Sequence, residues 1–276
     1  NNDIFLCKIY KFWGYIMNYK KRLAVAMVGM IVSAGLLAGC GSDKKEAQLT
    51  QTAGVLKVGS ETTFPPFEFA EENTNKYIGF DVDLSEEVAK RLGLKLEFVS
   101  MGFDALIPAT QSGNIDMIAA GINATPEREK ALAFSEPYFK EGGFITIVRK
   151  DNTDIKKMDD LANKRLGVQI GTVPVEMAKA IPGTDVKEMD SNSNIFMALQ
   201  AGTIDGAIID QAVAMYYLKQ GADKDLKLVG EGTDAPPFVL GFNKSNTALR
   251  DKVNEALKAM REDGTYDKIY AKWFAK

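Results

Sequence analysis

Short apolar runs alternate with amphipathic helical patterns from residue 55 onward. The runs VLKVGS, KLEFVS and DMIAAGI predict strands, and helical patterns lie between them at residues 81–92 and 104–112. In the first helix, five apolar side chains between Val82 and Leu92 fall on one stripe. Strands and helices in alternation indicate parallel β-α-β units with helices covering a sheet.

A second series of the same kind begins at about Lys164. RLGVQIG, VKEM and DGAIID predict strands, and PVEMAKAI and NIFMALQAG predict helices. In both series a helix is followed by a glycine, a polar residue, Ile-Asp and a strand. Gly113 and Gly202 are therefore expected just past a helix end, where a positive φ is needed. Two lobes of similar local design are the simplest account, and chance convergence of a common connection is the alternative.

Two segments are candidates for the connections between these lobes. EPYFKEGGF leads out of the first series and DAPPFVLGF leads out of the second, and the tail predicts two helices, the second after Asp263-Gly264. If the tail packs on the first lobe, the connections cross side by side as a hinge, and hinged lobes enclose a cleft. The expected boundaries are 54–139 and 240–276 for lobe 1 and 140–239 for lobe 2, with hinge strands near 138–143 and 234–240.

The N-terminal segment has the form of an export signal. From Met17 a basic start is followed by a short apolar stretch and by Leu-Ala-Gly-Cys. The LAGC sequence resembles a bacterial lipobox, which implies cleavage before Cys40 and lipidation of its sulfur. We therefore expect a signal peptide at 1–39, of which 1–16 precede the start residue, and a lipid-anchored tether at 40–53. An uncleaved signal anchor is the alternative.

Charge and composition exclude several function classes. The chain has a net charge of −3, which becomes −7 without residues 1–39, because that segment holds five basic residues and one acidic residue. An acidic body disfavours nucleic acid as a partner. The absence of histidine excludes histidine bases and histidine metal ligands. We expect no metal or cofactor, and no intrachain disulfide, because Cys40 would be the sole remaining cysteine.

An arginine follows the strand that ends at Gly121. The carboxyl ends of parallel strands are where ligands bind in open sheets, so this segment is expected at the cleft. Thr125 is typical of a helix N-cap, with Pro126 as the first helical residue. Arg128 then lies beside the free amides of a helix start and can grip a carboxylate. The alternative is a capped surface helix in which Arg128 pairs with a neighbouring glutamate.

Longer motifs occur along the chain in a fixed order: GSETTFPPFEF, KYIGFDVDLSEEVAKRLG, FDALIPATQSGNIDMIAAGINATPERE, AFSEPYF, LGVQIGT and LRDKVNEALKAMREDGTYDKIYAKWF. Together they closely resemble the polar amino-acid-binding family, family 3, of extracellular solute-binding proteins, the receptor subunits of ABC importers. The resemblance covers Leu56 to Phe274. It implies a two-lobed α/β fold of the periplasmic-binding-protein type, each lobe a mostly parallel sheet flanked by helices, with two hinge strands. It also implies an extracytoplasmic receptor that delivers an amino acid to an ABC permease and has no enzymatic activity.

The resemblance also assigns the residues that hold the amino acid itself. Arg128 matches the family arginine that binds the α-carboxylate, supported by amides near Gly121 and Asn123. Thr172 matches a residue that contacts this carboxylate from the second lobe, and Asp210 matches the acid that holds the α-ammonium. A zwitterion bound by one cation and one anion on different lobes makes closure depend on the ligand. For Asp210, a simple N-cap of the next helix is the alternative.

Specificity is expected from the part of the pocket that receives the side chain. Phe64 and Phe103 match aromatic walls, with core packing as the alternative. Glu61 matches an acid that accepts hydrogen bonds from arginine, lysine or histidine, which favours a basic ligand, arginine first. Glutamine is the alternative, because glutamine-binding relatives also carry an acid here and an exposed Glu61 would contribute little. Gln169 either bonds the ligand side chain or caps the strand edge. Asn123 and Val173 depart from the family pattern.

An enzyme and a sensor module are the alternatives from other function classes. Some relatives on this fold are dehydratases or lytic glycosidases, and Glu61 is the acid that such chemistry would need. The Arg128 and Asp210 clamps favour a protein that holds its ligand unchanged. A sensor would need a signalling domain, and the sequence ends at Lys276, shortly after the last helix. We therefore expect a lipid-anchored monomer.

Overall fold

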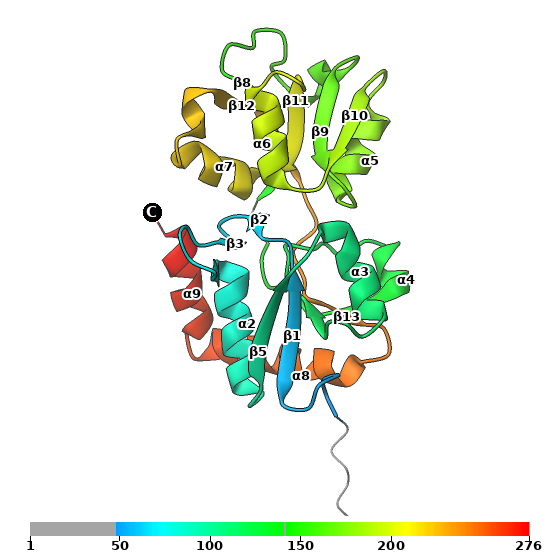
Figure 1. Ribbon diagram of the computed structural model, residues 1–276, viewed down its shortest axis with the longest axis vertical. Coiled ribbons are helices and arrows are strands. Elements are labelled where there is room, and N and C mark those ends of the chain that lie inside the picture. The colour runs from blue at the N-terminus through cyan, green and yellow to red at the C-terminus, as the bar shows by residue number, and fades with distance from the viewer. Residues whose placement is uncertain (1–47, 141, 276) are drawn as a thin grey trace, which may run out of the picture. The chain divides into compact units, whose positions relative to one another are not determined.

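The computed structural model describes residues 48–140 and 142–275 (Figure 1). The expected signal peptide and Cys40 lie outside the described residues. The last residues of the expected tether pack on the body: the Gln51 N–H donates to Asp116 (2.7 Å), and Asn246 donates to the Leu49 carbonyl (2.8 Å). None of the described helices is long and apolar enough to cross a membrane.

The first lobe is built on a five-stranded sheet in the order β5-β1-β6-β13-β7. β1 pairs in parallel with β5 and β6, whereas β13 is antiparallel to β6 and β7. The expected strand DMIAAGI keeps only two residues of regular strand, because the chain leaves the sheet after Ile118 and turns at Gly121 (φ 55°). The strands are β1 Val55–Ser60, β5 Lys95–Ser100, β6 Met117–Ile118, β7 Leu132–Phe134 and β13 Gly241–Asn243.

The helices of the first lobe come from both ends of the described chain. They are α2 Phe80–Arg91, α3 Phe103–Gln111, α4 Arg128–Ala131, α8 Thr247–Glu262 and α9 Thr265–Phe274. A small antiparallel sheet, with strands β2 Thr63–Phe64, β3 Glu68–Ala70 and β4 Tyr77–Ile78, lies beside α2.

The second lobe has its own five-stranded sheet, in the order β10-β9-β11-β8-β12. β9 pairs in parallel with β10 and β11, and β8 is antiparallel to β11 and β12. The strands are β8 Gly143–Arg149, β9 Arg165–Gln169, β10 Asp185–Met189, β11 Gly206–Asp210 and β12 Leu226–Asp234. The helices are α5 Val173–Ala180, α6 Asn192–Gln200 and α7 Gln211–Lys219, with 3-10 turns η1 Met158–Leu161 and η2 Ala222–Lys224. The expected two-lobed α/β fold is confirmed.

The repeated helix–glycine–strand connection is present in both lobes. Gly113 follows α3 with φ 76°, and Gly202 follows α6 with φ 71°. Both glycines occupy the left-handed position past a helix end, which side-chain-bearing residues adopt only at a cost. This prediction is therefore confirmed.

The two connecting segments cross side by side, as expected for a hinge. The Tyr138 N–H donates to the Phe238 carbonyl (3.0 Å), and the Phe238 N–H donates to the Phe139 carbonyl (2.8 Å). Farther along, Gly143 pairs with Asp234 at the start of the second sheet. The tail packs on the first lobe, where α9 and α8 contact α2.

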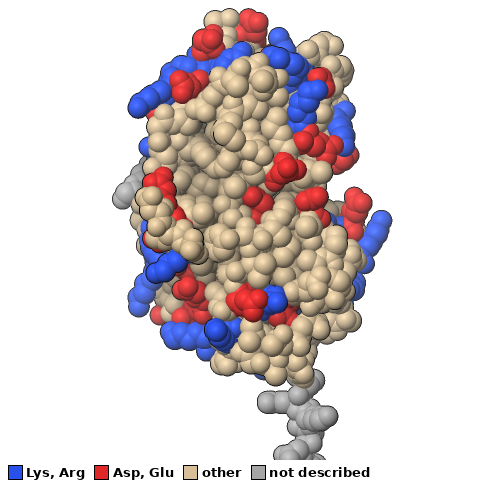
Figure 2. Space-filling model, viewed as in Figure 1, with Lys and Arg blue, Asp and Glu red and all other residues tan. Residues whose placement is uncertain are grey.

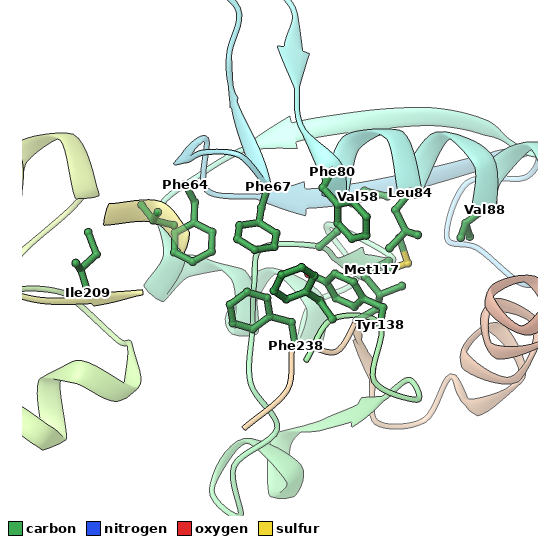
Figure 3. Close-up of a cluster of buried hydrophobic side chains, with 14 of the residues drawn as sticks. Val58, Phe64, Phe67, Phe80, Leu84, Val88, Met117, Tyr138, Ile209 and Phe238 are labelled. Atoms are coloured by element: carbon green, nitrogen blue, oxygen red, sulfur yellow. The ribbon is translucent and has the colours of Figure 1, made fainter. Parts of the chain in front are cut away.

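An aromatic cluster continues from the first lobe through this crossing (Figure 3). Phe67 lies between Phe64 and Phe80, with ring centroids 5.3 and 6.3 Å away. Phe139 from one connection and Phe238 from the other stack at 5.7 Å. The hinge is thus fixed to the first lobe by buried aromatic area.

Candidate functional site

A single cavity between the lobes brings together all nine ligand-contact residues expected from the sequence. The volume open to water-sized molecules inside it is about 30 Å³. The nine are Glu61, Phe64, Phe103, Gly121, Asn123 and Arg128 from the first lobe and Gln169, Thr172 and Asp210 from the second. The lining also contains Glu68, Ala120, Phe144, Val173, Pro174, Asn192, Ile208 and Ile209.

Arg128 is buried and spans the cavity. Its guanidinium donates to the carbonyl of Asn123 (2.9 Å) and, across the cleft, to the carbonyl of Gly171 (2.9 Å), and it lies 5.3 Å from the ring centroid of Phe103. The side chain is only 8% exposed, so the alternative of a surface arginine paired with a glutamate is wrong. These bonds use two of the five N–H groups, and the others can meet a ligand carboxylate.

The local structure around Arg128 differs from the expected helix. Thr125 accepts the Arg128 N–H with its hydroxyl (3.2 Å), as an N-cap does, but α4 is a single turn. A helix of one turn has little macrodipole, so the charge of the guanidinium itself is the main attraction for an anion. Burial lowers the pKa of Arg128 to about 10, which keeps it a cation at neutral pH.

One of the amides near the ligand carboxylate has another partner. The Gly121 N–H donates to the buried carboxylate of Asp81 (3.2 Å), so this N–H is engaged within the protein, and support from the other amides near Gly121 and Asn123 stays a prediction. The Asn123 side chain donates to the Pro236 carbonyl (2.6 Å). Asn123 thus ties the cavity wall to the second hinge connection.

Asp210 ends β11 and stands at the N-cap position of α7. Its carboxylate accepts no capping hydrogen bond, so the simple-cap alternative is wrong. Among the described residues it has no ion-pair partner, and burial raises its pKa to about 7. Asp210 is half-buried, and a partly desolvated carboxylate without a donor is costly, a cost that a ligand ammonium would relieve.

Glu61 is held in a network that joins the two lobes. The carboxylate accepts hydrogen bonds from the Gln169 amide (3.0 Å) and the Thr63 hydroxyl (2.9 Å). The Thr63 hydroxyl in turn accepts the Asn192 N–H from the second lobe (3.0 Å). Burial raises the pKa of Glu61, and these hydrogen bonds oppose that shift. The side chain is 6% exposed, so the alternative of a weak, exposed Glu61 is wrong.

The side chains of Gln169 and Thr172 form hydrogen bonds to other groups of the protein. The Gln169 amide donates to Glu61, and its oxygen accepts from the Asn192 side chain (3.1 Å). The Gln169 amide also donates to the Asp190 carbonyl just past β10 (3.3 Å), as expected for a cap of the strand edge, and its bond to the ligand side chain stays a prediction. The Thr172 hydroxyl donates to the Gln169 carbonyl (2.6 Å), and Thr172 is the N-cap residue of α5.

Both interpretations of the two phenylalanines, pocket wall and core packing, apply at the same time. Phe64 and Phe103 are 7% and 8% exposed, and each belongs to a hydrophobic cluster while also lining the cavity. Rings that are fixed by the core and present one face to a pocket make rigid walls.

Glu68 and Asn192 are the polar lining residues that sequence reasoning missed. Glu68 lies between Phe67 and Phe69 in β3, and simple alternation would place it on a solvent face. Packing of α2 against this small sheet instead leaves Glu68 0% exposed. Asn192 is the first residue of α6, and no sequence pattern marked it as a residue of the cavity.

Acidic groups predominate at this site. The ionisable residues of the cavity lining are Glu61, Glu68, Asp210 and Arg128. Figure 2 shows further Asp and Glu side chains along the boundary between the lobes on the face that it presents. No group of three or more potential metal ligands occurs among the described residues. The site is therefore suited to a ligand that carries both charges and an excess of positive charge.

Comparison with known proteins gives one consistent family. Residues 56–276 match the bacterial extracellular solute-binding proteins, family 3. The L-cystine-binding protein TcyA of Bacillus subtilis is 32% identical, with 92% of this chain and 98% of that protein covered. Two solved structures have a TM-score of 0.76. An ancestral arginine-binding protein bound to arginine is 46% identical, over 80% of this chain and 99% of that one. An ancestral arginine-binding protein bound to glutamine is 44% identical, over 82% and 100%.

Proposed function

The chain belongs to the bacterial extracellular solute-binding proteins of family 3, and we propose that it binds a basic amino acid, arginine before lysine or histidine, for delivery to an ABC permease. The lobes close around the ligand. Arg128 receives the α-carboxylate and Asp210 the α-ammonium, with Thr172 beside the carboxylate. Phe64 and Phe103 enclose the side chain, whose positive group meets Glu61.

The balance of charge in the cavity carries this proposal. Arg128 is the single basic residue among the described residues that line the cavity, and it stands against three carboxyl groups. A zwitterion brings one charge of each sign and leaves an acidic excess, whereas arginine brings one more positive charge. Buried charges are stabilising only when they are matched, so the excess favours a ligand with a cationic side chain.

Glutamine is the second candidate, and the bonding of Glu61 is the observation that favours it. Glu61 already accepts two hydrogen bonds from Gln169 and Thr63. A carboxylate with these partners can also accept from a neutral amide. An ancestral relative has been solved with glutamine bound, which supports this alternative for a similar pocket.

A thermal-shift panel of the common amino acids, on protein unfolded and refolded to strip any carried-over ligand, tests the proposal. A ligand at 100 times its Kd adds about 2.7 kcal/mol, which raises the Tm by about 5 to 10 °C for a protein of this size. We expect the largest shift with arginine. A response confined to glutamine replaces the proposal by its alternative, and a panel with no response refutes both.

Glu61→Gln separates the two ligands further. We expect this variant to lose about 2 to 5 kcal/mol of arginine binding and much less of glutamine binding, because only the cationic ligand loses a buried charge partner. Isothermal titration measures both. Glu97→Gln, which removes an exposed carboxylate paired with Lys57, is the matched control. Equal losses for the two ligands would contradict the charge-based account.

The remaining parts of the proposal are that the protein is not an enzyme, acts as a monomer and is lipid-anchored through Cys40. An amino acid incubated overnight with the protein should be recovered unchanged. The wild type should incorporate labelled fatty acid and Cys40→Ala should not, because lipidation needs the sulfur. A wild-type protein that stays unlabelled would refute the anchor and leave the binding function untouched.

A further inference from the structure

Two buried carboxyl groups lie near each other, that of Glu68 in the cavity lining and that of Asp81 outside it. Glu68 lines the cavity and Asp81 lies in the first turn of α2, and both residues are 0% exposed. Both oxygens of Glu68 and the Oδ1 of Asp81 have no hydrogen-bond donor among the described residues. Such oxygens are costly to bury unless the group is neutral or paired.

The backbone brings these two groups together. The Asp81 N–H donates to the carbonyl of Phe67, the residue before Glu68 (2.8 Å). This approach requires glycine at position 79, where φ is 140° and an added Cβ would lie 2.0 Å from the Phe67 carbonyl oxygen. The start of α2 is therefore held against β3.

One carboxylate oxygen of Asp81 accepts two hydrogen bonds. Its Oδ2 accepts the Tyr138 hydroxyl (2.6 Å) and the Gly121 N–H (3.2 Å). Gly121 lines the cavity, and Tyr138 lies in the first hinge connection. Asp81 thus links the cavity wall to the hinge, and its Oδ1 remains for Glu68.

The groups that face Glu68 are nearly all acidic. They are Asp81 from α2, Glu61 after β1, Asp210 from β11 and the Tyr138 hydroxyl, and Arg128 lines the same cavity. Burial first, and then these carboxylates, raise the pKa of Glu68 well above its usual range. Burial raises the pKa of Asp81 to about 6, against the hydrogen bonds from Tyr138 and Gly121. Asp81 accepts two hydrogen bonds on its Oδ2, which favour its ionised form, whereas Glu68 accepts none, so the geometry assigns the shared proton to Glu68.

We propose that Glu68 is protonated at neutral pH and donates a hydrogen bond to Oδ1 of Asp81, which makes Glu68 a positioning residue of the ligand cavity. With this bond, both oxygens of Asp81 are satisfied. The fixed carboxylate then orients the Gly121 N–H and the Tyr138 hydroxyl, and through them the cavity wall and the hinge connection.

The shared proton also sets the charge that a ligand meets, a consequence that rests on the proposed function. With Glu68 neutral, the cavity has one uncompensated negative charge when Glu61 and Asp210 are both ionised beside the cation Arg128. Arginine and lysine carry one net positive charge, whereas glutamine carries none. A neutral Glu68 therefore matches the cavity to a singly charged basic amino acid.

Infrared spectroscopy of the ligand-free protein at pH 7 tests the protonation directly. We expect the wild type minus Glu68→Gln difference spectrum to show the C=O stretch of a protonated carboxylic acid, because ionised carboxylates lack this band. Any protonated Asp210 cancels in the difference. Glu72→Gln, which removes an exposed carboxylate, should give no such band. Carbon-13 labelling of glutamate in the wild type identifies the band even if the variant does not fold, and its absence there overturns the proposal.

The pH dependence of unfolding gives an independent test. A glutamate in the unfolded chain has a pKa of about 4.3, so between pH 5 and 8 the folded protein keeps a proton that the unfolded chain has lost. Its stabilising effect is complete below the unfolded pKa and is lost as the pH rises through the folded pKa. From urea unfolding at several pH values, we expect the free energy of unfolding of the wild type to fall more steeply with rising pH than that of Glu68→Gln. The difference between the two slopes should correspond to about one proton. Parallel slopes would overturn the proposal. Neither test uses a ligand, so both stand whatever the panel of amino acids shows.

Discussion

Arg128 and Asp210, two charged residues of one cavity, differ in their hydrogen bonding within the protein. Arg128 is already bonded to two carbonyls, one from each lobe, whereas Asp210 has no hydrogen-bond partner among the described residues. Both residue types and positions could be predicted from the motifs around them. Their bonding could not, because it depends on where Gly171 and α7 lie in space. The buried role of Glu68 was missed for the same reason.

Removal of either charge should weaken binding strongly. We expect Arg128→Ala and Asp210→Ala each to cost about 2 to 5 kcal/mol of binding free energy for the amino acid that binds best, because the ligand charge is then buried without its partner. Isothermal titration measures the loss. Arg250→Ala, which breaks an ion pair with the adjacent Asp251 in α8, is the control and should bind normally. Unchanged affinity in either site variant would remove that residue from the site.

Binding should also depend on pH through Asp210. Its pKa in the free protein is raised to about 7, so acidification neutralises the carboxylate that is proposed to hold the α-ammonium. Affinity is present above this pKa and should fall by up to about tenfold for each pH unit below it. Titrations between pH 5 and 8 measure the effect, and Asp210→Asn should bind weakly with a flatter profile. A wild-type affinity that stays constant over this range would contradict the assignment.

Among the elements, long periodic segments were predicted well and short ones poorly. The stripe from Val82 to Leu92 corresponds to α2, and the apolar run VLKVGS corresponds to β1. The expected helix at Pro126 is only the single turn α4, because the chain enters β7 at Leu132. Such boundaries follow from tertiary pairing, here of β7 with β13, which comes from a segment far along the sequence.

The glycine at the end of α6 gives a prediction at this scale. Gly202 has φ 71°, and an added Cβ would meet only Arg149 at an ordinary contact distance of 3.5 Å. Gly202→Ala should therefore lower the free energy of unfolding by about 1 to 2 kcal/mol through backbone strain alone. Urea unfolding measures it. Gly202→Asn should lose less, because asparagine adopts this conformation more readily, and equal losses would point to a cause other than φ.

At the scale of the whole described unit, the lobes meet through direct hydrogen bonds as well as through the hinge. Thr63 is central to them: its hydroxyl donates to Glu61 and accepts the Asn192 N–H, and its carbonyl accepts the Tyr217 hydroxyl (3.3 Å). The hinge and the two lobes could be predicted from sequence, whereas these contacts carried no recognisable motif.

Loss of the Thr63 hydroxyl should favour opening of the lobes. We expect Thr63→Val to weaken ligand binding by about 1 to 3 kcal/mol, mainly through faster dissociation, because two hydrogen bonds across the network are lost. Stopped-flow measurement of the dissociation rate is the direct check. Thr74→Val removes a hydroxyl that bonds Glu71 in an exposed loop and should have no effect. A Thr63→Val variant with wild-type dissociation would show that these bonds do not hold the lobes together.

The position of β13 in the first sheet has a consequence for the order in which the chain folds. β13 lies between β6 and β7, so residues 241–243 complete a sheet whose other strands end at residue 134. The second sheet uses only residues 143–234 and can be finished first. During synthesis from the N-terminus, the lobe that begins earlier therefore reaches its native pairing later. Until the tail emerges, β6 and β7 each lack the strand that separates them in the finished sheet and expose unpaired edges.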